Sequence, residues 1–247
     1  MGKLTPGANL IDEIWNGLRQ AINLLLDRDP ALTQIVALSV RVSGAALVFS
    51  TLIGVPVGVI FGLTRFVGRR LVVALTYTGM GFPPVVIGLL VYLMLSRSGP
   101  LGQLNSPLIP NLFTPGAMII AQTIIAFPLV AGFTMAAVMG VDRQLRQQVE
   151  SLGATPWQTA WTVVMEARVG VSVAIIAAFG RIIAEVGAVM LVGGNIEGRT
   201  RVMTTAIVLE TRKGNFELAI ALGLILLSIA FIVNATMTRL QGRSFDA

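Results

Sequence analysis

The chain has 247 residues, of which 55% are hydrophobic and 12% are charged, and its formal net charge is +6 at pH 7. Together with a mean hydropathy of +0.82, this composition excludes an ordinary soluble globular domain and indicates an integral membrane protein. The absence of cysteine and histidine also excludes disulfides, thiol nucleophiles, iron–sulfur ligation and imidazole chemistry from this chain.

The residues other than cysteine and histidine also give little indication of an enzyme. The only lysines are Lys3 and Lys213, and both lie outside the long apolar runs, so a Ser–Lys mechanism within the membrane is disfavoured. The phosphate-binding pattern G-x-x-x-x-G-K-[ST] is absent, so the chain does not bind ATP in the P-loop manner. We expect no catalytic residues, no metal and no cofactor here, and any ATP-driven step requires another subunit.

The N-terminal segment has amphipathic character. Residues 10–26 place Leu10, Ile14, Leu18, Ile22 and Leu25 at helical spacing. This pattern predicts a helix that lies in the membrane interface, or, equally, one that packs on the bundle. We therefore separate residues 1–34, an interfacial helix and linker, from a transmembrane domain over residues 35–247.

Five apolar runs follow, each long enough to cross the bilayer as a helix of about 20 residues. They cover residues 35–63, 71–96, 116–140, 170–193 and 217–238. Their unbroken apolar character argues against a β-barrel, whose strands alternate in polarity. The predicted fold is an all-α integral membrane protein with five transmembrane helices preceded by an interfacial amphipathic helix.

Small residues and prolines indicate where these helices pack and bend. Gly54, Gly58 and Gly62 recur every four residues, which predicts a helix face that another backbone approaches closely. Prolines also interrupt the backbone hydrogen bonds of three spans, at Pro56, Pro83, Pro84 and Pro128. Kinks at these positions suit a bundle that opens and closes, although proline is also common in static membrane helices.

The polar loop of about residues 142–168 has a helical pattern of apolar residues, which is unusual for a connection between spans. Apolar residues recur in it at helical spacing: Val149, Leu152, Trp157, Trp161, Val164 and Met165. This pattern predicts two short helices joined by a turn. We expect a docking element that a partner outside the bilayer binds.

The fourth run contains two ionisable residues, Arg181 and Glu185. A helix that starts near Val171 places Arg181 about 15 Å into the membrane, and residues four apart lie on one face, so we expect the two to pair. Ionisable groups at this depth usually face a bundle interior or a water-filled path. Two hypotheses follow: Arg181 belongs to an anion route that Glu185 regulates, or the two form a buried structural ion pair.

Glycines and cations follow this run in the segment of residues 192–201, which includes Asn195, Arg199 and Arg201. The apolar piece over residues 202–209 is too short to cross, so it predicts a re-entrant or interfacial helix. Cations between residues 199 and 213 suit an anionic substrate, or they snorkel toward anionic lipid. Lysines and arginines divide equally between the two sides of the bundle, so the positive-inside rule does not decide the orientation.

Two motifs resemble the permease subunits of ABC importers for molybdate and tungstate oxyanions. Residues 147–153 resemble the E-A-A-x-x-x-G motif, with Gly153 at its glycine, and Thr155, Pro156, Trp157 and Trp161 continue the similarity. Residues 193–201 and 204–207 resemble the G-N-I-x-G-x-T-x segment and the following helix of oxyanion permeases. Residues 204–214 are most similar to the tungstate branch. Two departures are Gln147 at the motif's glutamate and Glu166 where many members have proline.

The resemblance implies a type I importer permease core in which the loop of residues 142–168 is cytoplasmic and couples to an ATPase. The implied coupling residues are Gln147, Glu150, Ser151, Gly153, Ala154, Thr155 and Trp157. From their charge and position, the candidate residues of a transport path are Arg181, Glu185, Asn195, Arg199 and Arg201.

The resemblance also implies partners and a location. The partners are a second copy of the chain, a cytoplasmic ABC ATPase dimer that binds ATP and Mg, an external substrate-binding protein, the oxyanion and membrane lipid; nucleic acid is not among them. The expected location is the inner membrane of a prokaryotic cell, with the N-terminus outside and the C-terminus cytoplasmic. Tungstate is the expected substrate. The alternatives are molybdate or sulfate, or an ATP-independent secondary transporter or channel.

Overall fold

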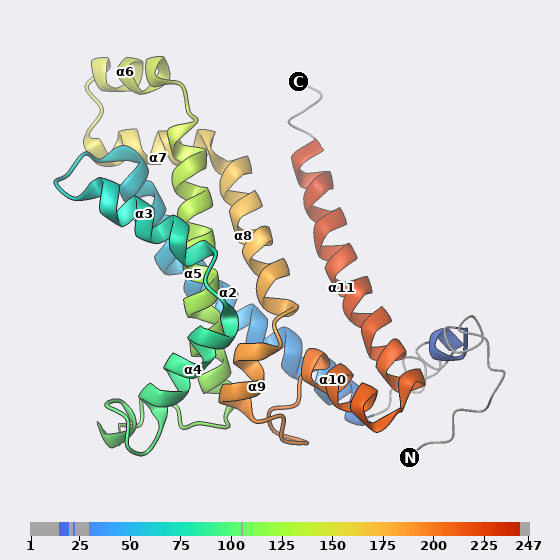
Figure 1. The fold of residues 1–247 in the computed structure, drawn as a ribbon. Helices are drawn as coiled ribbons and strands as arrows, with labels where there is room; N and C mark the ends of the chain where they lie inside the picture. Colours follow the sequence, from blue (N-terminus) through green and yellow to red (C-terminus); the bar gives the residue numbers. More distant parts are fainter. Residues whose placement is uncertain (1–14, 20–21, 23–29, 105, 243–247) are drawn as a thin grey trace.

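The computed structural model describes residues 15–19, 22, 30–104 and 106–242, and no β-strand occurs among them. Figure 1 shows an elongated bundle of helices. The elements are α2 (Pro30–Leu63), α3 (Arg69–Met80), α4 (Pro84–Leu95), a 3-10 turn (Gly102–Leu104), α5 (Pro115–Met139), α6 (Arg143–Ser151), α7 (Pro156–Glu166), α8 (Arg168–Ile183), α9 (Gly187–Gly193), α10 (Met203–Lys213) and α11 (Phe216–Gly242). The all-α prediction is confirmed.

Three single helices are long and apolar enough to cross a membrane: α2, α5 and residues 216–236 of α11. Two bent pairs raise the number to five if each pair is one span: α3 with α4, bent by 102°, and α7 with α8, bent by 68°. The first, third and fifth predicted spans therefore correspond to single helices. Most of the predicted interfacial helix over residues 10–26 lies outside the described residues.

The second predicted span, residues 71–96, is two helices joined at a sharp bend. Pro83 has an extended backbone (φ −63°, ψ 120°) and Pro84 begins α4. Neither proline has a backbone N–H to continue the hydrogen bonds of α3, so the helix ends at Met80 and a new one begins. The predicted break at this proline pair is confirmed, and the bend is larger than a kink.

The fourth predicted span, residues 170–193, is wrong as a single helix. The structure ends α8 at Ile183 and begins α9 at Gly187. The carboxylate of Glu185 accepts the backbone N–H of Ala188 (3.0 Å), in the first turn of α9. A carboxylate that binds a free N–H at a helix start stabilises that start, so Glu185 supports the break.

Helices α2 and α5 form the central contact of the bundle, and the glycines predicted to allow a close approach lie in it. A β-carbon on Gly58 would lie 2.5 Å from the Ala131 carbonyl oxygen, and one on Gly54 would lie 2.9 Å from Val130 Cβ. Because these distances are shorter than van der Waals contact, only glycine permits this approach. The predicted packing face is confirmed.

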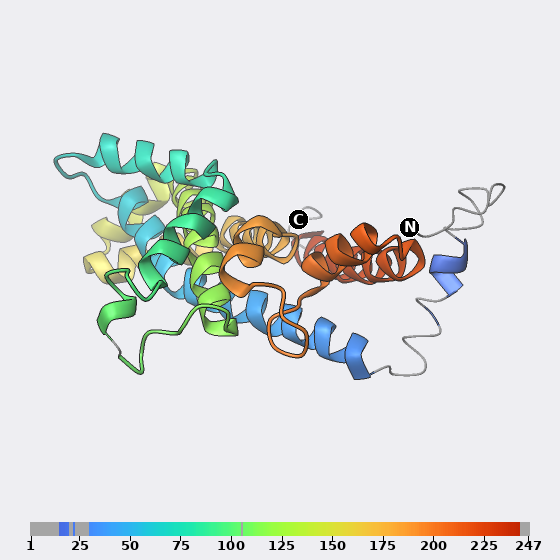
Figure 2. The same ribbon diagram turned by 60° about the horizontal axis from the view of Figure 1, so that its bottom comes forward.

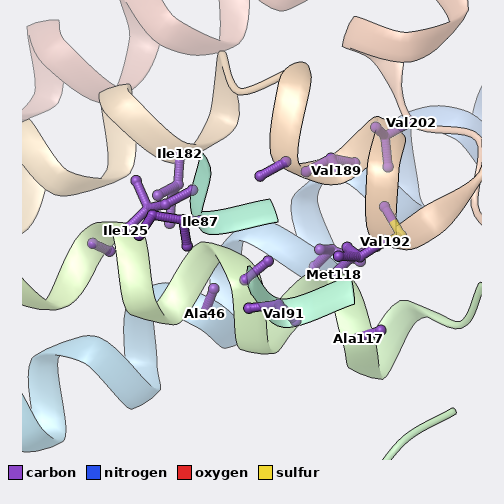
Figure 3. Close-up of a cluster of buried hydrophobic side chains, with 14 of the residues drawn as sticks. Ala46, Ile87, Val91, Ala117, Met118, Ile125, Ile182, Val189, Val192 and Val202 are labelled. Carbon is purple, nitrogen blue, oxygen red and sulfur yellow. The ribbon is translucent and has the colours of Figure 1, made fainter. Parts of the chain in front are cut away.

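The largest buried cluster surrounds α5 (Figure 3). Helix α5 contributes Met118 and Ile125, which meet Ile87 and Val91 of α4 and Ile182 of α8. In a lipid-embedded bundle such contacts stabilise by close packing. The cluster makes α2, α4, α5, α8 and α9 one packed unit.

Helices α10 and α11 extend to one side of this unit (Figure 2). Their own buried cluster consists of Met203 and Ala206 of α10, Leu222 and Ile225 of α11, and Leu32 of α2. Helix α10 contains the apolar piece predicted over residues 202–209 and, at 11 residues, is too short to span the bilayer. It lies at the end of the bundle opposite α6 (Figure 1).

Candidate functional site

The helix–turn–helix predicted over residues 142–168 is confirmed as α6 and α7, which lie together at one end of the bundle (Figure 1). Asp142 is the N-cap residue of α6, and its side chain accepts the backbone N–H of Gln144 (2.8 Å). Thr155 and Gln158 form a reciprocal capping box at the start of α7, with Gln158 Oε1 2.8 Å from the Thr155 backbone nitrogen. Both helix starts are therefore encoded locally.

Gly153 lies in the turn between α6 and α7 with φ +84° and no other atom within 4 Å of where a β-carbon would be. Its backbone N–H donates to the Glu150 carbonyl oxygen at 3.0 Å. The left-handed backbone favours glycine at this position, while the space around it would admit a side chain.

The predicted coupling residues lie on this one surface. Gln147, Glu150 and Ser151 are exposed on α6, and Glu150 pairs with Arg146 at 3.1 Å. Ala154, Thr155 and Trp157 follow in the turn and the first turn of α7. The most exposed apolar side chains of α6, α7 and the turn between them are Leu152 at 89%, Trp157 at 77% and Trp161 at 59%. Large exposed apolar side chains on a polar loop indicate a contact surface.

The predicted Arg181–Glu185 pair is wrong. Among the described residues the ion pairs are Arg146–Glu150, Glu197–Arg201 and Glu210–Lys213. Arg181 is exposed on α8, whereas Glu185 is buried at 7% exposure beyond the end of that helix. The break after Ile183 removes the i, i+4 relation that the prediction assumed.

Glu185 belongs to a buried polar cluster at the helix break instead. A cavity of about 10 Å³ is lined by its side chain and by Ser39, Ser43, Gln122 and Thr204, among others. Thr204 Oγ1 donates to the Glu185 carbonyl oxygen (2.9 Å), and Gln122 Nε2 donates to the Ile182 carbonyl oxygen (2.9 Å). These side chains bind the carbonyls that the break leaves free. Gln122, Ser39 and Ser43 are site residues that the sequence reasoning missed; polar residues within apolar runs were their signal.

Asn195, Arg199 and Arg201 lie in the turn between α9 and α10. Asn195 has a left-handed backbone (φ 51°), and its Nδ2 lies 3.5 Å from the Thr205 carbonyl oxygen. Arg201 pairs with Glu197 at 3.2 Å, while Arg199 is exposed. Asparagine tolerates this conformation better than most residues, so the turn has a local cause.

A cavity of about 420 Å³ adjoins this turn, between the start of α2, α10 and α11. Its charged lining consists of Arg199, Arg201, Lys213, Glu197 and Glu210. Lys213 Nζ lies 2.8 Å from Glu210 Oε1, and this hydrogen bond, opposed by burial, lowers the pKa of Glu210. Both carboxylates already bind cations of the same cavity. Arg181 and Glu185 do not line it, so the structure divides the predicted path residues between two places.

Comparison with known families is decisive for the class of protein. Residues 54–245 match the sequence profile of the binding-protein-dependent transport system inner membrane component. The chain belongs to this family. It is a multi-pass inner-membrane permease, a transport subunit rather than an enzyme, and its ATPase is a separate subunit. A binding-protein-dependent system also contains a substrate-binding protein.

Similar proteins agree with this family over most of the permease. A probable anion ABC transporter permease protein of Haloferax volcanii is 46% identical, over 86% of this chain and 92% of the relative. A tungstate uptake system permease protein of Peptoclostridium acidaminophilum is 39% identical, over 94% of this chain and 99% of the relative. A chain in the crystal structure of a bacterial alginate ABC transporter matches with a TM-score of 0.72 at 18% identity, over 94% of this chain and 87% of that chain. The structural match shows the fold of a type I importer permease.

Proposed function

We propose that the permease imports an oxyanion, tungstate in the first place, and couples ATP hydrolysis by its partner to alternating access. The observation that carries the substrate class is the cavity of Arg199, Arg201 and Lys213 at the end of the bundle opposite the α6–α7 loop. Three cations against two carboxylates leave a positive excess that attracts an anion. The names of the anion and tungstate relatives support the same class.

Coupling is assigned to the α6–α7 loop. The ATPase, which binds ATP and Mg, contacts the surface formed by Gln147, Glu150, Ser151, Gly153, Ala154, Thr155 and Trp157. The left-handed turn at Gly153 and the exposed indole of Trp157 support this assignment. Movement of the loop then rocks the packed unit around α5 as one body, because closely packed helices transmit displacement.

The complex that this function needs contains two copies of the permease, two ATPases and the external binding protein. Arg181 is exposed on α8 and has no ion-pair partner among the described residues. An unpaired cation within a predicted membrane span is costly unless it faces water or a polar partner. We assign Arg181 to a central path between two copies of the permease. Glu185 and the buried polar cluster lie next to it in the chain, in the break between α8 and α9.

ATP hydrolysis by the reconstituted complex tests the substrate assignment. The permease is placed in liposomes with its ATPase and binding protein, and hydrolysis is measured with tungstate, molybdate and sulfate in turn. We expect tungstate to stimulate most. Greater stimulation by molybdate or sulfate reassigns the oxyanion. No stimulation by any of the three contradicts an oxyanion importer, and ATP-independent uptake favours a secondary transporter or channel.

A matched pair of variants connects this assay to the cavity. Arg199→Gln removes a cation from the cavity lining, while Arg212→Gln removes an exposed cation that does not line it. We expect only Arg199→Gln to lower tungstate-stimulated hydrolysis. Equal effects of the two variants would show that overall charge matters and the cavity does not.

A further inference from the structure

Four arginines surround a hollow of about 670 Å³ between the end of α2 and the α6–α7 loop. We call it the arginine hollow; its charged lining consists of Arg65, Arg69, Arg143, Arg146, Asp142 and Glu150. The four arginines exceed the two carboxylates by two positive charges. Of these charged residues the transport function proposed above uses Glu150, and it gives the four arginines no role.

Both carboxylates of the arginine hollow are already engaged. Asp142 accepts the backbone N–H of Gln144 at the start of α6, and Glu150 pairs with Arg146. Arg69 Nε donates to the Phe61 carbonyl oxygen at 3.0 Å, which holds that side chain at the end of α2. Among the described residues Arg65 and Arg143 have no ion-pair partner, so both guanidiniums are available to an anion.

An apolar groove of about 650 Å³ opens from the same rim. Leu63, Thr64, Arg146 and Glu150 line both spaces. From that rim the groove follows α2 back to Val55, a distance of about 12 Å at the rise of an α-helix. Its other wall is α7, including the exposed indoles of Trp157 and Trp161.

The charged end and the apolar end together match one kind of molecule. The groove follows α2, which is long and apolar enough to cross a membrane, while the hollow lies at the end of that helix. Tryptophan is typical of the membrane interface. We propose that the arginine hollow and the groove bind one anionic phospholipid, with its phosphate at Arg65 and Arg143 and an acyl chain along α2.

Lipid binding at this site bears on coupling because Arg146 and Glu150 belong both to its rim and to the docking loop. A phosphate that binds Arg65 and Arg143 connects the end of α2 to the start of α6 by charge-assisted hydrogen bonds. The lipid would therefore hold the docking loop against the span that packs on α5. The proposal does not depend on which substrate is transported.

Native mass spectrometry of the full-length permease in mild detergent tests the proposal. Phosphatidylglycerol and phosphatidylcholine with identical acyl chains are added separately. We expect preferential retention of phosphatidylglycerol by about thirtyfold, from the attraction of two basic side chains. The variant Arg65→Gln/Arg143→Gln should lose this preference, whereas Arg97→Gln/Arg212→Gln, with the same loss of charge at exposed positions elsewhere, should keep it.

The groove is tested separately from the charge. Ile60 is 52% exposed and lines the groove, so Ile60→Trp should fill it and lower retention of phosphatidylglycerol. Ile232→Trp is the control, at an exposed position of α11. Size-exclusion chromatography and far-UV circular dichroism confirm that each variant is folded.

Three outcomes would overturn the lipid assignment. The first is equal retention of the two lipids by the wild-type permease. The second is displacement of phosphatidylglycerol by millimolar inorganic phosphate together with no effect of Ile60→Trp, which would identify a site for free anions. The third is a dimer of the permease whose interface covers the groove. Such a dimer would retain no lipid, and the Ile60→Trp variant would be monomeric.

Discussion

Gly153 shows how one residue sets the geometry of the docking loop. Its left-handed backbone turns the chain from α6 to α7, and it leaves Leu152 and Trp157 exposed on either side. A β-branched residue is strained in this conformation, whereas asparagine adopts it readily. The turn thus depends on backbone freedom and does not depend on a lack of space.

We predict that Gly153→Val leaves the amount of permease in the membrane unchanged and abolishes substrate-stimulated ATP hydrolysis by the reconstituted complex. Gly153→Asn should retain most of the stimulation, because no atom lies where its side chain begins. Hydrolysis rates with and without substrate are the measurement. Normal stimulation of the valine variant would refute the docking role of this turn.

Glu185 illustrates how a single side chain changes role between sequence and structure. Spacing alone made it the partner of Arg181, but in the structure its carboxylate binds the Ala188 N–H at the start of α9. Its carbonyl oxygen accepts the hydroxyl of Thr204, 19 residues away. The position of Thr204 depends on how α10 packs, so a local pattern did not reveal this bond.

At the scale of elements, the contact between α2 and α5 depends on glycine at three successive turns. Gly58 is closest, with the Ala131 carbonyl oxygen and Thr134 Cβ both within 2.8 Å of a β-carbon placed on it. Gly44 lies on the same helix, and no atom lies within 4 Å of its β-carbon position. The two glycines therefore form a matched pair for testing the packing.

We predict that Gly58→Ala lowers the stability of the permease by about 1–3 kcal/mol, because overpacking forces the two helices apart. Gly44→Ala should be neutral or stabilising by up to about 1 kcal/mol, because alanine favours a helix. Thermal unfolding in detergent, followed by size-exclusion chromatography, measures both. An unchanged melting temperature for Gly58→Ala would contradict the close approach.

At the scale of the whole molecule, the coupling surface and the substrate cavity proposed above lie at opposite ends of the bundle. The α6–α7 loop and the C-terminal end of α11 lie at one end, while α10 and the connection from α4 to α5 lie at the other (Figure 1). Coupling and substrate entry are therefore assigned to opposite sides of the membrane. If the proposed coupling role of the α6–α7 loop is correct, we expect a cytoplasmic C-terminus.

The absence of cysteine permits a direct test of this orientation. Leu152 is 89% exposed in the docking loop and Leu108 is 91% exposed between α4 and α5. We predict that a membrane-impermeant maleimide labels Leu108→Cys in intact cells and labels Leu152→Cys only in inside-out vesicles. The cysteine-free parent is the control, and the reverse pattern would invert the proposed topology.

Much of the architecture was predictable because its causes are local. Length and apolarity identify α2, α5 and α11, the proline pair marks the bend before α4, and Thr155 with Gln158 encodes the start of α7. These features depend on backbone hydrogen bonds and on hydration of nearby residues, which short stretches of sequence determine. The docking loop was predictable for the same reason.

The arginine hollow and the buried polar cluster around Glu185 were less predictable, because each joins residues that lie far apart in the chain. The arginines of the hollow between α2 and α6 were missed as a site, and their clustering beside membrane spans was the available signal. The buried polar cluster around Glu185 combines α2, α5, α8 and α10. Such groupings follow from helix packing, for which the sequence contains only indirect evidence.

The sequence by itself determined that this protein is a helical membrane protein with a helix–turn–helix loop, because composition, periodicity and capping act over a few residues, whereas the permease family was indicated by the resemblance of its motifs. Tertiary structure alone decided that the fourth apolar run breaks after Ile183, that Arg181 and Glu185 separate, and that Arg199, Arg201 and Lys213 share a cavity. The physical reason is that a buried polar group takes the nearest partner in space. For Glu185 that includes a threonine from another helix.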